Sequence, residues 1–378
     1  MRVQSLQLRQ FRNYQNQAVT LHPQMNIFLG ANAQGKTSLI ESLYVLAFTK
    51  SYRCQNYREL IQFEADFAKI TAQIELAERH VELTTILSKK GKKLQINGVE
   101  QQRLNEYIGQ LAVIKFSPED LELVKGQPSI RRKFLDIELS QASPAYFLAL
   151  ANFQRLLKQR NEYLKQTQLD EIYLDILDEA LAQVAGKIYW QRFCFVKEMN
   201  AIIRPIHEQL TQKQEQILIQ YQTDLGNECA DFTEEHFFSQ AYKKVLKKSI
   251  ARDRKLQSTT TGPHKDDLQF FIATRNVKQF GSQGQQRTTV LSLKLAEIEW
   301  FAQKRQEYPI LLLDDVLSEL DDQRKVQLLN FINDKVQTFI TTTEMHEILS
   351  DLTGAYTVFD VKDGKLFEVG ETTNDTKL

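Results

Sequence analysis

Short apolar runs and helical repeats alternate along the chain and divide it into a strand-rich first part and a helical middle. Alternating apolar residues predict strands at residues 6–8 and 25–29, and a helix follows from about Lys36. Its apolar positions share one face: Leu39, Ile40, Leu43 and Leu46. Residues 81–87 and 93–96 flank a lysine-rich turn, which is typical of a β-hairpin. We therefore expect the first 118 residues to be β-rich apart from one helix.

The apolar residues change to a helical period at about residue 119. They recur at helical spacing in two runs: Leu150, Phe153, Leu157 and Leu164, then Ile176, Ala180, Val184, Ile188 and Phe195. Pro205 predicts a kink or an end in the second run. At 1.5 Å per residue this segment is too short for a very long coiled-coil arm. We interpret residues 119–207 as an inserted helical domain, either compact or a short antiparallel pair.

Strands and helices alternate again in the last part of the chain. Residues 217–221 predict a strand, and a basic helix follows from about Glu234 to Arg254. Two apolar runs around Asp363-Gly364 predict a closing hairpin. Residues 208–378 are thus a second α/β part, and a prior of about 150 residues per domain allows two or three units in 378 residues.

A glycine-rich loop directly follows the predicted strand at residues 25–29. The octet Gly30-Ala31-Asn32-Ala33-Gln34-Gly35-Lys36-Thr37 has the pattern G-x-x-x-x-G-K-[ST] between a strand and a helix. In such a loop the backbone N–H groups and the helix N-terminus bind phosphate oxygens. Lys36 would reach the outer phosphates, and the Thr37 hydroxyl is placed to ligate Mg²⁺. The alternative is a glycine-rich surface turn with a nearby lysine, but the context favours a nucleotide site.

Two carboxylates end the fully apolar run at residues 310–313. Because such a strand is buried on both faces, Asp314 and Asp315 would lie beside the glycine-rich loop at the carboxyl edge of the sheet. Asp314 fits the role of holding Mg²⁺, and Asp315, with Lys36, is the predicted catalytic residue that polarises the attacking water. A solvated acidic turn is the alternative. Almost the whole chain separates the two halves of this site, so an insertion divides the ATPase domain.

Two further motifs resemble those of ABC-type ATPases. Ser282-Gln283-Gly284-Gln285 resembles their signature motif and precedes a strongly predicted helix; residues 318–321, which end at Asp321, resemble their D-loop. The resemblance implies that the signature residues and Asp321 contact nucleotide, and that Ser282 caps the γ-phosphate held by another copy. ATP would then join two heads. Taken alone, residues 282–287 are equally well explained as a polar turn that caps a helix.

A set of motifs spread over residues 1–343 narrows the resemblance to the RecF family of SMC-like recombination mediators. The motifs are Phe11-Arg12-Asn13-Tyr14, Phe116–Leu121, Arg131–Asp136, Thr261–Leu268 and Ser282–Arg287. The resemblance implies an α/β, ABC/SMC-type P-loop ATPase head of two lobes, built from residues 1–118 and 208–378, with residues 119–207 inserted. It also implies an ATP-dependent homodimer that binds DNA at single-strand/double-strand gap junctions and, with RecO and RecR, helps to load RecA.

The resemblance further implies weak, DNA-stimulated ATP hydrolysis with ATP and Mg²⁺ as cofactors. Asp315 stands where ABC transporters usually have Glu, one methylene longer, so we expect slow hydrolysis. The switch histidine of the superfamily is not evident, since His346 comes late and Thr343 precedes it. His264 is tempting as a catalytic residue, but a loop histidine that contacts backbone is the more economical interpretation.

Composition adds little to this picture. Lys plus Arg and Asp plus Glu both count 48, so any DNA surface must be a local patch. Basic residues cluster at 89–93 and 131–133, but the predicted DNA cluster is the one with helical spacing: Lys243, Lys244, Lys247, Lys248, Arg252 and Arg254. Three cysteines without metal-type spacing and the lack of a membrane-spanning run indicate a cytoplasmic protein with no membrane partner.

Three rival functions remain open from the sequence. An ABC-type transporter ATPase subunit is the main alternative, and it would dock membrane helices and ignore DNA. A purely structural SMC head would need long coiled-coil arms, and a small-molecule P-loop kinase would leave the signature motif and the D-loop unexplained.

Overall fold

Contacts within the chain divide it into two units. The computed structural model describes residues 1–226, 229, 233–343 and 354–374, with side chains described as far as residue 370. One unit comprises Met1–Asp120 and Leu293–Leu378, and the other comprises Leu121–Ser292. The first boundary lies close to the expected one. The second differs from the expected boundary at 207, because residues 208–292 group with the helical insertion and not with the ATPase head.

The first unit contains an antiparallel sheet that begins with the N-terminal strand. Its strands, in spatial order, are β2 (Tyr14–Thr20), β1 (Arg2–Phe11), β4 (Phe67–Glu75), β5 (His80–Ser88), β6 (Gly91–Ile96) and β7 (Val99–Glu100). The β5–β6 pairing confirms the hairpin expected around the lysine-rich turn. Alternate residues of β1 are buried, so the sheet covers the core with one face.

A second, mostly parallel sheet brings distant parts of the chain together. Its order is β15 (Lys365–Asn374), β14 (Gly354–Lys362), β3 (Met25–Leu29), β13 (Thr338–Thr342), β12 (Ile310–Asp314) and β8 (Val113–Phe116). Only β15 runs antiparallel to its neighbour, and its pairing with β14 confirms the closing hairpin. The carboxyl ends of β3, β13 and β12 therefore lie at one edge, where ligands bind in parallel sheets.

Helix α1 (Lys36–Phe48) packs against both sheets of the first unit. We expected one apolar face, but nearly every side chain from Leu39 to Ala47 is buried. The reason is its position, since a helix with a sheet on each side has no solvent face and reads as apolar all round. Shorter elements complete the unit: η1 (Tyr57–Leu60), α2 (Leu104–Tyr107), η2 (Pro118–Leu121), η4 (Leu317–Glu319) and α10 (Asp322–Ile332).

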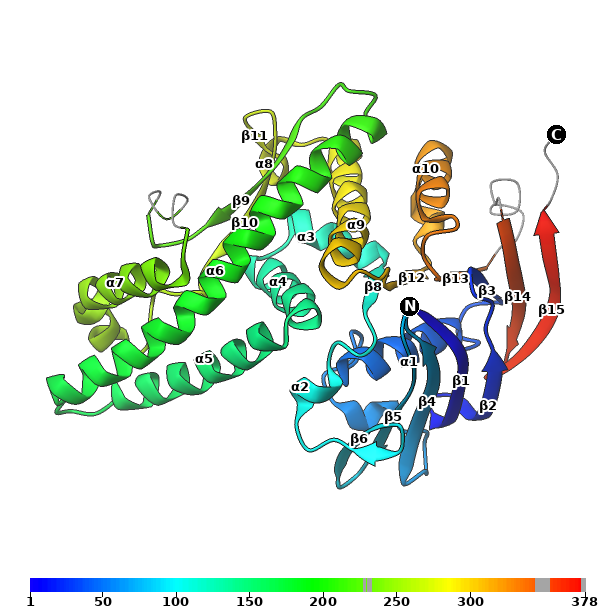
Figure 1. The fold of residues 1–378 in the computed structure, drawn as a ribbon, viewed down its shortest axis with the longest axis horizontal. Helices are drawn as coiled ribbons and strands as arrows, with labels where there is room; N and C mark the ends of the chain where they lie inside the picture. Colours follow the sequence, from blue (N-terminus) through cyan, green and yellow to red (C-terminus); the bar gives the residue numbers. More distant parts are fainter. Residues whose placement is uncertain (227–228, 230–232, 344–353, 375–378) are drawn as a thin grey trace. The chain divides into compact units, whose positions relative to one another are not determined.

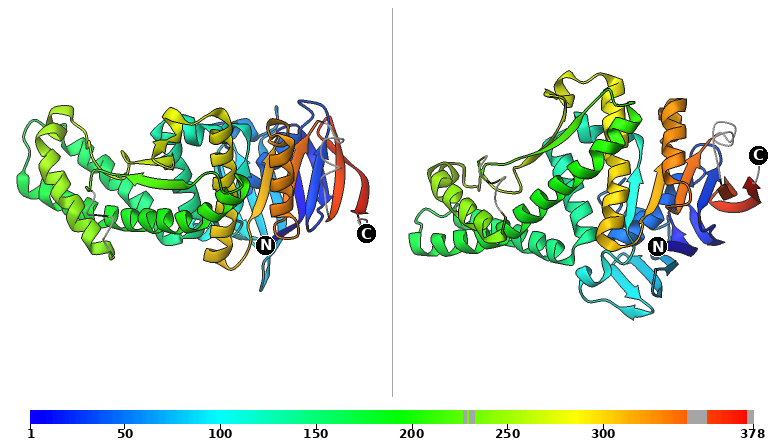
Figure 2. Two further views of the ribbon diagram at one scale, coloured as in Figure 1. Left: turned by 90° about the horizontal axis from the view of Figure 1, so that it is seen from above. Right: turned by 45° about the horizontal axis from the view of Figure 1, so that its top comes forward.

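The second unit is built on long helices. Its helices are α3 (Glu122–Lys125), α4 (Pro128–Ala142), α5 (Pro144–Tyr163), α6 (Glu171–Leu210), α7 (Glu235–Leu256) and α8 (Val277–Phe280). Figures 1 and 2 show α5, α6 and α7 side by side. Helix α6 is 40 residues long and continues past Pro205, so this proline does not end it.

A small sheet explains why residues 208–292 belong to the helical unit. Strand β9 (Ile217–Gln222) pairs with β10 (Asp267–Ile272), which pairs with β11 (Arg275–Asn276). Strand β9 also packs on α6, and α4 packs on β10. The predicted basic helix is α7, and it lies along α6. Helix α9 (Gln283–Arg305) is continuous from residues of the second unit into residues of the first.

Candidate nucleotide-binding site

The predicted phosphate loop joins β3 to α1, and its two glycines fit where other residues would not. Gly35 has φ 119°, and a Cβ there would lie 2.5 Å from Nδ2 of Asn13. A Cβ on Gly30 would lie 2.5 Å from the carbonyl oxygen of Val361. The side chains of Asn13 and Tyr14 donate hydrogen bonds to the carbonyl oxygens of Gln34 and Gly35, at 3.0 Å each. The loop is thus held close to the side chains of Asn13 and Tyr14 on one side and to the backbone of β14 on the other.

The Lys36 ammonium folds back over the loop. Its Nζ donates to the carbonyl oxygens of Gly30 and Ala31, at 2.6 and 3.0 Å. Burial lowers the pKa of Lys36, and the carboxylates of Asp315 and Asp314 oppose that shift. Since both carboxylates act on this ammonium, the structure brings the two predicted halves of the site together.

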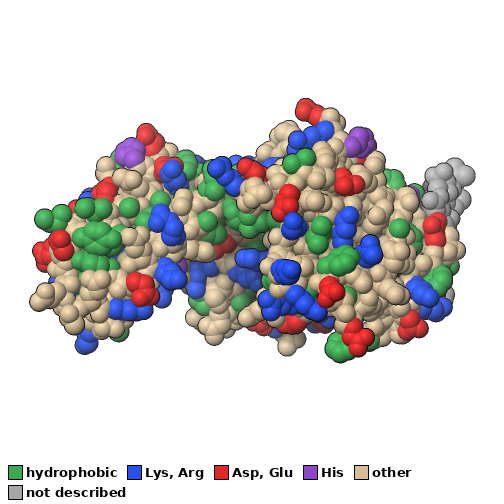
Figure 3. Space-filling model, turned by 90° about the horizontal axis from the view of Figure 1, so that it is seen from below, with side chains coloured by type: hydrophobic (Ala, Val, Ile, Leu, Met, Phe, Trp, Pro, Cys, Tyr) green, Lys and Arg blue, Asp and Glu red, His purple; other side chains and the backbone are tan. Residues whose placement is uncertain are grey.

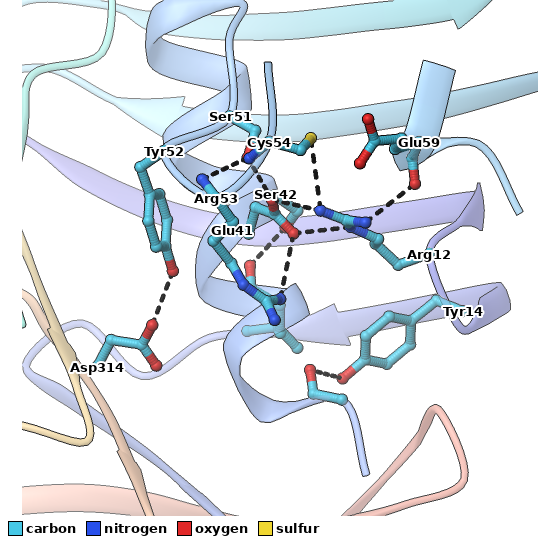
Figure 4. Close-up of polar contacts among 12 residues, drawn as sticks. Arg12, Tyr14, Glu41, Ser42, Ser51, Tyr52, Arg53, Cys54, Glu59 and Asp314 are labelled. Carbon is cyan, nitrogen blue, oxygen red and sulfur yellow. Dashed lines mark hydrogen bonds and ion pairs between the residues drawn. The ribbon is translucent and has the colours of Figure 1, made fainter. Parts of the chain in front are cut away.

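Strand β13 lies between β3, which leads into the phosphate loop, and β12, which ends at Asp314. The sequence did not predict this arrangement. Thr341 of β13 donates a hydrogen bond of 3.0 Å to Oδ1 of Asp314 and accepts one of 2.9 Å from the backbone N–H of Asp315. Tyr52 donates to the other oxygen of Asp314, Oδ2, at 2.8 Å (Figure 4). Burial, followed by the Asp314 charge, raises the pKa of Asp315. Two hydroxyl groups therefore fix the predicted metal ligand.

A pocket of about 840 Å³ opens over the phosphate loop. Six predicted site residues line it: Asn32, Ala33, Gly35, Lys36, Thr37 and Asp315. Asp314 is buried behind them. The remaining loop residues face other partners, because Gly30 and Ala31 bind Lys36 while Gln34 accepts a hydrogen bond from the backbone N–H of Asp363.

Three arginines on the pocket wall were not predicted as site residues. They are Arg12, Arg53 and Arg58. Arg12 binds the buried carboxylate of Glu41 through Nε and Nη2, at 2.9 Å each, and Arg53 lies 3.6 Å from the same carboxylate (Figure 4). Arg12 stood within a family motif, but nothing in the sequence near Arg53 and Arg58 pointed to the pocket. These guanidinium groups give the wall the positive charge that a polyphosphate requires.

The chemistry of the donor set suits Mg²⁺. Thr37 offers a hydroxyl and Asp314 a carboxylate, and Mg²⁺ prefers such oxygen ligands together with substrate phosphates and water. In the part of the chain that the structure describes, no group of three or more His, Cys, Asp or Glu residues could hold a metal ion by itself. A nucleotide would therefore have to complete the coordination.

The predicted signature residues form the N-terminal cap of α9. The Ser282 Oγ accepts a hydrogen bond of 3.2 Å from the backbone N–H of Gln285, and the Gln285 side chain accepts one of 2.9 Å from the backbone N–H of Ser282. This reciprocal pair is a capping box. Ser282 and Gln283 are exposed, and the hydroxyl proton of Ser282 can still be donated. The predicted D-loop residue, Asp321, similarly caps α10 by accepting from the backbone N–H of Arg324.

The two histidines raised by the sequence have different outcomes. His264 lies against Phe153 with its Nε2 3.2 Å from the carbonyl oxygen of Thr259, and burial lowers its pKa to about 4. This confirms the prediction of a loop residue that contacts backbone. His346 lies outside the described residues.

The basic clusters are more extensively paired than the sequence indicated. Arg131 is buried and binds both carboxylate oxygens of Asp267, so its role is structural. On α7, Lys243, Lys247 and Arg254 form ion pairs with carboxylates of α6. Lys244, Lys248 and Arg252 are exposed along α7 at intervals of four residues. Figure 3 shows Lys and Arg side chains spread among acidic ones on the face drawn.

Comparison with known proteins agrees with this fold. The family model described as RecF/RecN/SMC N terminal domain matches residues 2–366. An SMC head bound to the C-winged helix domain of ScpA has the same fold, with a TM-score of 0.55 and 13% identity, and the alignment covers 99% of this chain and 98% of that one. The class is therefore that of SMC-like, ABC-type P-loop ATPase heads, as the sequence predicted.

Closer relatives narrow the class. The DNA replication and repair protein RecF of Enterococcus faecalis is 45% identical over 97% of this chain and 98% of its own, and that of Staphylococcus carnosus is 43% identical over 97% and 100%. A solved structure described as the recombination mediator protein RecF-ATP in the RecFOR pathway has a TM-score of 0.89 at 31% identity, covering 98% of both chains. The chain belongs to the RecF family. Among the described helices, none is long and apolar enough to cross a membrane.

Proposed function

We propose that this protein is an ATP-gated, DNA-binding dimer that acts in recombinational repair and replication as a partner of RecO and RecR. The observation that carries the proposal is the pocket over the phosphate loop, in which Lys36, Thr37 and Asp315 share one cavity with three arginines. The names of the relatives, the RecF-ATP structure and its RecFOR pathway support the same assignment. Full-length similarity to RecF proteins disfavours the transporter alternative.

In the proposed site each group has a distinct task. The backbone of the phosphate loop and the N-terminal end of α1 bind the β- and γ-phosphates, and Lys36 leaves its carbonyl partners to pair with them. Ile61 and Phe63 supply the apolar part of the wall, against which the base can pack. Thr37 and Asp314 hold Mg²⁺, which would neutralise phosphate charge.

Hydrolysis is proposed to be slow and to act as a switch. Asp315 lines the pocket and is the group that orients the attacking water. Its backbone has φ 52° and is fixed by Thr341, so the short side chain cannot advance easily toward the γ-phosphate. Ser282 of the partner subunit would cap that phosphate, because Ser282 is exposed at the N-terminal end of a long helix.

The test compares wild type with Lys36→Arg and Ser282→Arg. We expect Mg–ATP to convert wild type from monomer to dimer, and duplex DNA with a single-stranded gap to stimulate hydrolysis. Lys36→Arg loses both responses, whereas Ser282→Arg binds ATP but stays monomeric because a large cation fills the place of the capping hydroxyl. Analytical ultracentrifugation, nucleotide titration and phosphate release measure these outcomes.

Gln303→Arg is the matched control, since it adds the same charge at an exposed position near the other end of α9. It should dimerise like wild type. A dimer that forms without ATP and ignores DNA contradicts the proposal, as does normal dimerisation of Ser282→Arg.

A further inference from the structure

Tyr52 touches the predicted metal ligand without lining the nucleotide pocket. Its hydroxyl donates to Oδ2 of Asp314 at 2.8 Å (Figure 4). Its ring and that of Tyr44 pack edge to face. Burial, the Asp314 charge and that hydrogen bond all raise the pKa of Tyr52, so the phenol keeps its proton and remains a donor. With Thr341 donating to Oδ1, each oxygen of Asp314 has one fixed partner and a lone pair left for a cation.

The Tyr52 ring also meets a partly buried cation. The Lys115 Nζ lies 4.5 Å from the ring centroid, within range of a cation–π contact. The same ammonium donates to the Oγ of Ser117, whose backbone N–H donates to Oδ2 of Asp120 at 2.7 Å. Burial lowers the pKa of Lys115, and the charge of Asp120 opposes that shift. Lys115 is therefore held between the tyrosine ring and Ser117, and Ser117 connects it to the Asp120 carboxylate.

The contacts continue into α9. Oδ1 of Asp120 lies 3.6 Å from Nζ of Lys294, and Lys294 lies 3.0 Å from Oε2 of Glu297. The side chains of Lys294 and Glu297 are 6% and 1% exposed. Burial raises the pKa of Glu297. Removal of either Lys294 or Glu297 would therefore leave the other as an uncompensated buried charge. We call Lys115, Asp120, Lys294 and Glu297 the charged row; all four belong to the first unit.

We propose that Tyr52 is a positioning residue for the Asp314 carboxylate and links it, through the charged row, to helix α9. The inference rests on the proposed Mg–ATP site and adds a route by which binding of Mg–ATP affects helix α9. A cation bound to Asp314 shifts the carboxylate that Tyr52 holds. The Tyr52 side chain follows through its hydrogen bond, so its ring moves against Lys115. Because the four side chains of the row are at most 15% exposed and are linked by hydrogen bonds and ion pairs, with Ser117 between Lys115 and Asp120, a shift at one end changes partners at the other. Helix α9 begins at the signature motif, so occupancy of one half-site is transmitted to the other half-site of the same chain.

Tyr52→Phe tests the positioning role because it removes one hydroxyl and leaves the ring. We expect Mg²⁺-free binding of a fluorescent ATP analogue to be unchanged. The Mg²⁺ concentration needed for half-maximal tightening of that binding should rise about 10- to 100-fold, as for other residues that hold a metal ligand. Tyr107→Phe is the control, since Tyr107 is a buried tyrosine of the same unit whose hydroxyl pairs with Thr85 and not with Asp314. It should behave like wild type.

Unchanged Mg²⁺ dependence of Tyr52→Phe overturns the positioning role. If wild type itself shows no Mg²⁺-dependent nucleotide binding, the proposed function has failed, so the two failures are distinguishable.

Hydrogen exchange tests the link to α9. The measurement uses the Ser282→Arg background, in which α9 is not covered by a second copy. We expect Mg–ATP to slow exchange of the amides at residues 286–297, and Lys294→Met with Glu297→Leu to abolish that response while Mg²⁺ affinity stays unchanged. Both charges are removed together because deleting one would leave the other buried and unpaired. Equal protection with and without the charged row overturns the link.

Discussion

At the scale of single residues, the second unit contains buried groups whose ionisation differs from that of exposed ones. Asp266 accepts a hydrogen bond of 2.5 Å from the hydroxyl of Tyr221. Its pKa is raised from 3.8 to about 7 by burial, and Asp224 adds to the shift while Arg192 opposes it. A raised folded-state pKa means that the folded chain favours the protonated acid. The contribution of Asp266 to the free energy of unfolding is therefore fully present below about pH 4 and is lost as the pH rises through about 7.

Asp266→Asn mimics the protonated acid, so its free energy of unfolding should increase relative to that of wild type as the pH rises. Between pH 5.5 and 8, we expect the difference in unfolding free energy to move in favour of the variant by about 2 kcal/mol. Urea unfolding followed by circular dichroism at several pH values measures it. Glu171→Gln, at an 84% exposed carboxylate of the same unit, is the control and should show a flat difference. A flat difference for Asp266→Asn would mean that the acid is ionised in the folded chain.

At the scale of elements, helices α6 and α7 come close together at a glycine of α6. A Cβ added to Gly186 would lie 2.0 Å from Oγ and 3.0 Å from Cβ of Ser239. Alanine is the better helix former by about 1 kcal/mol, so an isolated helix would gain from the change. Here the helices would have to separate, and we expect Gly186→Ala to destabilise the second unit by about 1–3 kcal/mol.

Thermal unfolding of Gly186→Ala beside Lys187→Ala checks this expectation. Lys187 is exposed on the same helix, so its substitution should change stability by no more than about 0.5 kcal/mol. Restoration of stability by Ser239→Gly in the Gly186→Ala background would locate the clash. A gain in stability from Gly186→Ala alone contradicts the close approach of the two helices.

Local sequence patterns predicted single helices, strands and motifs well. They predicted less well how these elements pack together. The phosphate loop and Asp314-Asp315 are contiguous motifs, so the sequence placed them directly. Tyr52 and the pocket arginines act across loops or strands, and only folding brings them to the site. The boundary at residue 207 was missed for the same reason, because β9 belongs to the sheet of β10, some 45 residues further along the chain. Burial of α1 on all sides depends on two sheets that no helical period reveals.

At the scale of the whole molecule, equal numbers of acidic and basic residues require DNA binding to come from a local surface. The exposed stripe of Lys244, Lys248 and Arg252 on α7 is the candidate, since their neighbours are engaged with α6. Changing all three to Glu should weaken binding of gapped duplex DNA. The slope of log affinity against log salt concentration should fall by up to about 2.7, which is about 0.9 for each phosphate that the variant no longer neutralises.

Fluorescence anisotropy across a salt series measures that slope. A control places three Glu residues at exposed positions of α6, Gln183, Lys187 and Lys197, where no DNA binding is proposed; it changes the net charge by five units, against six in the α7 variant. An unchanged slope in the α7 variant, with folding intact, excludes this stripe as the DNA surface.

Helix α9 carries the signature residues at one end and the charged row further along, and this restricts how the gene can change. Each residue of an α-helix turns the chain by about 100°. One codon inserted or deleted between Gln283 and Lys294 would therefore rotate the capping box about a third of a turn away from its present heading, while Lys294 and Glu297 stay anchored. Substitutions on the exposed side of α9 are tolerable, but a change in its length is not. The length of this helix is thus as much a part of the proposed link as the side chains that it carries.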